Sequence, residues 1–183
     1  MAKISKIEVA KHQIDAAIRM FFDNEDIIPI HTLSRAGFRV MYDIAPENEQ
    51  KKALDAYIKK VGEPRFNEIT NFLKHADRDP DADIDDNFGL YTEAGIGFAL
   101  VLYQHQTGTL TPEMKAFAMW QKMMRPEFFE LPEQLSTDIK EWKSGSHTDP
   151  DKIETQANAR LFGKNLLHWV RLRMGQPSRK AAP

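Results

Sequence analysis

One helix end carries three polar side chains whose types suit proton transfer. Asn71 and His75 are four residues apart, so a helix places them on one face, with Lys74 beside them. An imidazole at a helix end can titrate near neutrality, and with a polar partner one turn earlier it can act as a general acid or base. Lys74 or Arg78 would then stabilise a phosphate. The alternative is a structural histidine that interacts with the last carbonyls of its helix.

A second set of basic side chains lies earlier in the chain. His31 and Arg35 are also four residues apart, and Arg39 follows one turn later. We expect this stripe to lie opposite the apolar face of its helix, where it would bind phosphate or carboxylate. The alternative is a solvated face that binds no ligand.

The C-terminal region is strongly basic. Residues 159–183 contain six basic residues and no acidic one. The rest of the chain therefore contains 19 basic and 27 acidic residues. Four of the side chains follow helical spacing and form a stripe that could lie along a nucleic-acid backbone: Arg160, Lys164, His168 and Arg171. Alternatively, the stripe pairs with acidic residues elsewhere in the chain.

An acidic segment over residues 77–86 has six carboxylates in ten residues, which suggests a calcium loop. A calcium loop of the EF-hand type needs glycine at position 6 and glutamate at position 12. A start at Asp77 places Ala82 and Phe88 at these positions, and a start at the next aspartate also fails. The alternative is a solvated loop whose last acids cap the following helix.

Composition excludes several classes of protein. The chain of 183 residues has no cysteine, which rules out disulfides, thiolate zinc sites and iron–sulfur clusters. Its formal net charge of −2 excludes a globally basic nucleic-acid binder. There is no Gly-rich phosphate loop, HExxH pair or GxSxG elbow, so we expect no metal and no cofactor. Without a signal peptide or a bilayer-length apolar run, the sequence predicts a cytoplasmic protein with no membrane partner.

Helical periodicity runs through almost the entire chain, and no strand pattern competes with it. It predicts an all-α protein, a single helical bundle of about six to eight helices over residues 1–174, with a disordered tail over 175–183. The segment 88–106 is apolar on nearly every side, so we expect this helix at the centre of the bundle. Gly95 and Gly97 within it predict a close approach by a neighbouring helix.

The stretch RFNEITNFLKHADRD, residues 65–79, resembles the signature region of HEPN proteins. The resemblance implies a small helical bundle that dimerises and cleaves RNA without a metal, with His75 as the family histidine and Asn71 as the polar residue before it. The family's arginine is replaced by Thr70, so Arg65 or Arg78 would have to hold the phosphate. The NFLKHAD segment also resembles bacterial helical proteins that have no established activity.

Three hypotheses follow. The first is a non-catalytic module that binds a partner protein or a small ligand, or dimerises, with a Met-rich and aromatic surface. The second is a HEPN-like metal-independent ribonuclease or nucleotide-binding domain that uses the helix end at Asn71 and His75. The third is a ligand pocket between helices with a polar histidine, His31 or His105, among three tryptophans: Trp120, Trp142 and Trp169.

Overall fold

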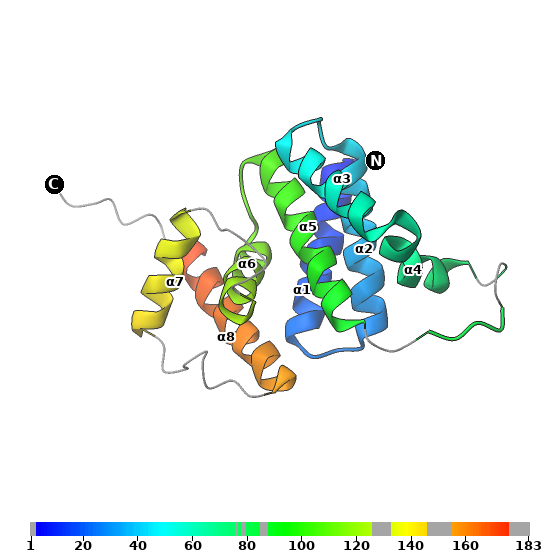
Figure 1. The fold of residues 1–183 in the computed structure, drawn as a ribbon. Helices are drawn as coiled ribbons and strands as arrows, with labels where there is room; N and C mark the ends of the chain where they lie inside the picture. Colours follow the sequence, from blue (N-terminus) through cyan, green and yellow to red (C-terminus); the bar gives the residue numbers. More distant parts are fainter. Residues whose placement is uncertain are drawn as a thin grey trace.

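The computed structural model describes residues 3–75, 77, 80–84, 88–125, 133–145 and 155–175 (Figure 1). Within these ranges the chain forms α-helices and no strand, which confirms the all-α bundle predicted from periodicity. The predicted tail lies almost wholly outside the described residues. The helices are α1 Lys6–Phe22, α2 Ile27–Ile44, α3 Glu49–Val61, α4 Glu63–Lys74, α5 Gly89–Thr107, α6 Pro112–Met124, α7 Glu133–Gly145 and α8 Gln156–Gly175.

Helices α1, α2 and α5 form the middle of the molecule, with α6, α7 and α8 on one side and α3 and α4 on the other (Figure 1). Helix α1 begins with a capping box between Ser5 and Glu8 and buries one face. At Gly37 of α2, an added Cβ would lie 2.7 Å from Cγ1 of Ile14. A glycine is therefore required where α1 and α2 cross.

Helix α5 is buried on nearly every side, as its composition predicts. An added Cβ at Gly95 would lie 3.4 Å from Cδ of Arg35 and 3.5 Å from Oγ of Ser34. Both are ordinary van der Waals distances to side chains of α2, so α2 packs on Gly95 without the close backbone approach that the sequence predicts. Helix α5 ends at Gly108 in the left-handed conformation, with φ 71°.

Aromatic side chains fill the contact of α1 with α6 and α8. Trp120 is buried among the rings of Phe21 and Phe117, and its Nε1 donates to the Ala159 carbonyl at 2.7 Å. A Cβ at Gly163 would overlap the ring of Phe22. The tryptophans are thus used in packing. None of them lines the cavities described below, so the third hypothesis gains no support.

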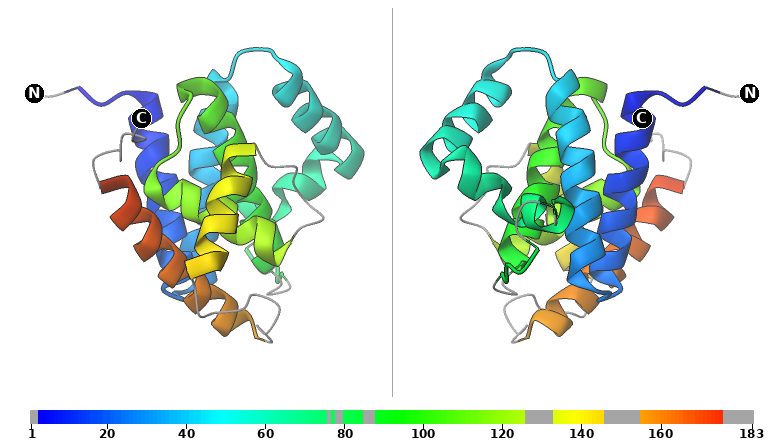
Figure 2. Two further views of the ribbon diagram at one scale, coloured as in Figure 1. Left: turned by 90° about the vertical axis from the view of Figure 1, so that its left-hand side faces the viewer. Right: turned by 90° about the vertical axis from the view of Figure 1, so that its right-hand side faces the viewer.

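Helices α3 and α4 form an arm that projects beside α2 and α5 (Figure 2). Gly62, at φ 89°, joins the two helices. Leu54 is the one buried residue among those described in the arm, which is held mainly by ring contacts such as Phe66 against Phe38 and Phe98. The sparse packing leaves cavities on both sides of the arm.

No helix in the described ranges has the length and apolarity to cross a membrane.

Candidate functional site

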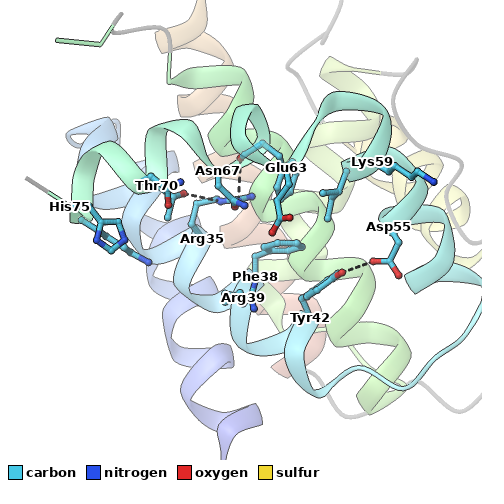
Figure 3. A pocket seen from close by; sticks show the side chains of 14 residues that line it. Arg35, Phe38, Arg39, Tyr42, Asp55, Lys59, Glu63, Asn67, Thr70 and His75 are labelled. Carbon is cyan, nitrogen blue, oxygen red and sulfur yellow. Dashed lines mark hydrogen bonds between the residues drawn. The ribbon is translucent and has the colours of Figure 1, made fainter. Parts of the chain in front are cut away.

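A cavity of about 630 Å³ lies between α2, α3 and α4 (Figure 3). Its charged lining combines four cations with two carboxylates. The lining residues are Arg35, Phe38, Arg39, Tyr42, Asp55, Ile58, Lys59, Glu63, Phe66, Asn67, Thr70, Asn71, Lys74 and His75.

Arg35 is the buried cation of this cavity, with 6% of its surface exposed. Its Nε donates to Oγ1 of Thr70 at 3.1 Å, and its Nη2 donates to Oδ1 of Asn67 at 2.8 Å and to the Phe66 carbonyl at 3.3 Å. The guanidinium also lies 4.2 Å from the centre of the Phe66 ring. All of these partners are neutral, and Nη1 donates to no described residue.

No carboxylate in the described part of the chain pairs with Arg35. Burial, and then the nearby charge of Arg39, lower the pKa of Arg35 to about 10. Arg39 itself pairs with Asp43 at 3.0 Å. The cavity therefore contains a desolvated positive charge that no described residue neutralises.

His31 lies directly behind Arg35 and is 2% exposed. Its Nδ1 is 3.0 Å from Oγ1 of Thr92, whose hydroxyl already donates to the Phe88 carbonyl, so Nδ1 must carry the proton. Oγ1 of Thr70 accepts from Arg35 and therefore directs its own proton at Nε2 of His31, 3.4 Å away. Each hydroxyl accepts once and donates once, which fixes the neutral imidazole in one tautomer.

Burial lowers the pKa of His31 from 6.5 to about 4, and the charges of Arg35 and Lys74 add to the effect. The alternative of a solvated face is wrong for His31 and Arg35. Both are buried, because α4 and α5 pack over this side of α2. A helix pattern alone cannot show that polar side chains from other helices will solvate such residues.

Asn71, Lys74 and His75 line the same cavity as Arg35, at the end of α4. Asn71 and Lys74 are exposed and His75 is half-buried. His75 ends the helix, and its backbone N–H donates to the Asn71 carbonyl at 3.0 Å. The structure thus brings together two sets of residues that the sequence presents separately. The side chain of Arg65 and all of Arg78 lie outside what the structure describes.

The far end of the cavity carries charges of both signs. Asp55 accepts a hydrogen bond of 2.5 Å from the Tyr42 hydroxyl, and this bond is the main reason that the pKa of Tyr42 rises to about 12. Figure 3 shows this pair on the opposite side of the cavity from His75. The sequence pattern does not identify three residues of this cavity, Tyr42, Asp55 and Asn67, because no local spacing links α3 and α4 to α2.

The basic stripe of α8 pairs with polar and acidic groups of the chain. Arg160 is buried, donates to Oδ1 of Asn24 at 2.9 Å and covers the ring of Phe21. Lys164 is 2.6 Å from Asp23, and Arg171 is 2.6 Å from Glu113. His168 is exposed. The pairing supports the alternative in which this stripe serves the fold.

Residues 78, 79, 85 and 86 of the acidic segment lie outside the described ranges, so its calcium hypothesis stays a prediction. Within those ranges, no three ligand side chains are grouped to hold a metal ion.

Comparison of the chain with protein-family models, with curated proteins and with solved structures found no match. The resemblance to HEPN proteins therefore stays a prediction that rests on residues 65–79. Function is inferred below from the geometry and charge of the cavities.

Proposed function

We propose that this protein is a non-catalytic binding module for a small organic anion, held in the cavity between α2, α3 and α4. One observation carries the proposal: Arg35 is desolvated, has no carboxylate partner among the described residues and lines an open cavity. A charged group in such surroundings is costly unless an opposite charge compensates it. An anion would supply that charge and accept hydrogen bonds from Nη1.

The neutral partners of Arg35 favour this role. Thr70, Asn67 and the Phe66 carbonyl fix the orientation of the guanidinium without neutralising it. Only the N–H groups of Nη1 remain to donate charge-assisted hydrogen bonds to an oxygen of a carboxylate or phosphate. Because the guanidinium is buried, these hydrogen bonds would be stronger than those of an exposed arginine.

The positions of Lys74 and Asp55 support a site for the anionic group at the His75 end of the cavity. Lys74 lies at the end nearer His75, whereas Asp55 lies at the opposite end, with its Tyr42 hydrogen bond. The anion would thus bind between Arg35 and Lys74, and the remainder of the ligand would extend past the ring of Phe66.

The first experiment is isothermal titration calorimetry with pyrophosphate and with citrate, which represent phosphate-bearing and carboxylate-bearing ligands. We expect saturable binding of at least one anion, about tenfold weaker in Lys74→Ala. Lys60→Ala is the matched control, because Lys60 is an exposed lysine of the same arm that does not line the cavity. No binding of either anion, or equal weakening by both substitutions, would contradict the proposal.

A second candidate is metal-independent cleavage of RNA. It is favoured because His75 and Asn71 share the cavity with Arg35, so an imidazole, an amide and a guanidinium would surround one phosphate. In this scheme His75 is the acid or base, Asn71 orients it and Arg35 contacts the phosphate. Cleavage of labelled RNA in EDTA that His75→Ala abolishes would support it. Equal cleavage by both proteins, or none, would remove it.

A further inference from the structure

The buried histidine of α2 is joined to the anion cavity by a hydroxyl group. Thr70 lines that cavity, and its Oγ1 lies 3.1 Å from Nε of Arg35 and 3.4 Å from Nε2 of His31. Because Nε of Arg35 can only donate, the oxygen of Thr70 accepts there and its hydrogen is directed at the neutral imidazole. While His31 is neutral, the Thr70 hydroxyl therefore does not donate to a ligand.

Protonation of His31 would reverse this hydrogen bond. Nδ1 already donates to Oγ1 of Thr92, so an added proton goes to Nε2, which then donates to Thr70. The oxygen of Thr70 would accept from both His31 and Arg35, which uses its two lone pairs. No other described residue accepts from the Thr70 hydroxyl, so its hydrogen would need a new acceptor. An oxygen of an anion in the cavity would fill this role.

The charges around His31 act in the same direction. Burial is the main cause of the lowered pKa of His31, and the charges of Arg35 and then Lys74 lower it further. The proposed anion binds between these two cations and would offset their charges. The cost of a further positive charge at His31 would then fall.

Another cavity, of about 510 Å³, lies between α2, α4 and α5 and gives a proton from solvent a path to His31. Arg35 lines it too, together with two carboxylates and two tyrosines: Glu68, Asp83, Tyr57 and Tyr91. Helix α5 and its N-cap present Thr92 and the ring of Phe88 to His31, and neither is charged. None of these groups adds a positive charge, so Arg35 and Lys74 are the cations that an anion must offset.

We infer that proton uptake by His31 regulates the anion cavity: the bound anion draws a proton from solvent onto Nε2, and Thr70 turns its hydroxyl from the imidazole to the ligand. The inference rests on the proposed anion site. Because coupling between two sites is reciprocal, anion affinity should rise as the pH falls through the range in which His31 titrates. The ligand would be held more tightly at mildly acidic pH than at neutral pH.

The experiment follows each imidazole by NMR as the pH is lowered, with saturating pyrophosphate or with sodium chloride of equal ionic strength. The His31 resonance is the one missing from His31→Gln, and its contacts with Thr92 identify it without any variant. We expect pyrophosphate to raise the proton affinity of His31 about tenfold. Each histidine is read separately, so a response of His75, which lines the anion cavity, is not mistaken for that of His31. His12, exposed on α1 and outside both cavities, is the internal control.

Two substitutions at Thr70 test the hydroxyl. Thr70→Ser keeps it and should retain the full change, whereas Thr70→Val removes it and should reduce the change to about threefold or less. A full change in Thr70→Val, or binding of pyrophosphate in the calorimeter with no change at His31, would overturn the inference and leave the anion site in place. Citrate replaces pyrophosphate if it alone binds. Absence of binding by either anion at any pH would remove the anion site itself, and the inference with it.

Discussion

Replacement of Arg35 by methionine tests whether the guanidinium binds a ligand or serves only to hold α4 against α2. The substitution keeps most of the apolar stem but removes the charge and every donor. The pKa of Arg35, which burial lowers to about 10, corresponds to a cost of about 3 kcal/mol for the charged form in the folded state. Three hydrogen bonds to neutral acceptors offset this cost, each contributing about 1 to 1.5 kcal/mol.

These opposing contributions nearly cancel, so Arg35→Met should change the free energy of unfolding by no more than about 1.5 kcal/mol. Ligand binding should respond very differently. At an anion concentration 100 times Kd, the wild type gains about 2.7 kcal/mol, which for a chain of this size raises Tm by about 5 to 10 °C. The variant should show almost none of this increase.

The assay is urea and thermal unfolding of both proteins, with pyrophosphate and with sodium chloride of equal ionic strength. The chloride samples correct for general screening of the charged surface. If Arg35→Met lost more than about 3 kcal/mol without ligand and kept the wild-type increase in Tm, the guanidinium would be a clamp for α4. The reasoning from its desolvation to an anion site would then be refuted.

Three other positions give effects of known sign: the buried histidine of α2, the glycine of α8 and the cap of α6. Between about pH 6.5 and pH 4, His31 takes up a proton in the unfolded chain but stays neutral in the folded one, so folding loses about 3 kcal/mol of stability as the pH falls. Urea unfolding at successive pH values should show that His31→Gln lacks this loss. Gly163→Ala should lower the free energy of unfolding by about 1 to 3 kcal/mol through overlap with an aromatic ring, whereas Gly145→Ala, with open space around it, should not. Thr111→Val should cost about 1 to 3 kcal/mol, because the hydroxyl caps α6 and donates to buried Asp15; a thermal melt that shifts by less than 1 °C would count against this cap.

The helical architecture follows from local sequence. Periodicity is a property of neighbouring residues, and it predicts the central position of α5 because apolar residues surround that helix on all sides.

The site depends on contacts that local sequence does not contain. His31 and Arg35 form a polar stripe on the helix pattern, yet Thr70, 35 residues after Arg35, solvates both of them in the fold. The stripe on α8 has the same spacing, but Arg171 finds Glu113 and remains half exposed. The same spacing therefore gives buried residues at His31 and Arg35 but a half-exposed ion pair at Arg171, because the partner helices differ.

The sparse packing of the α3–α4 arm has a consequence for its dynamics. With Leu54 as the buried residue among those described in these two helices, the arm should open with a free energy well below that of global unfolding, while α1, α2 and α5 stay closed. Amide hydrogens of α3 and α4 should then exchange with solvent earlier than those of the central helices. An anion that joins α2 to the arm would slow this exchange by about the factor 1 + [L]/Kd, so the amides of the arm would report occupancy of the cavity residue by residue.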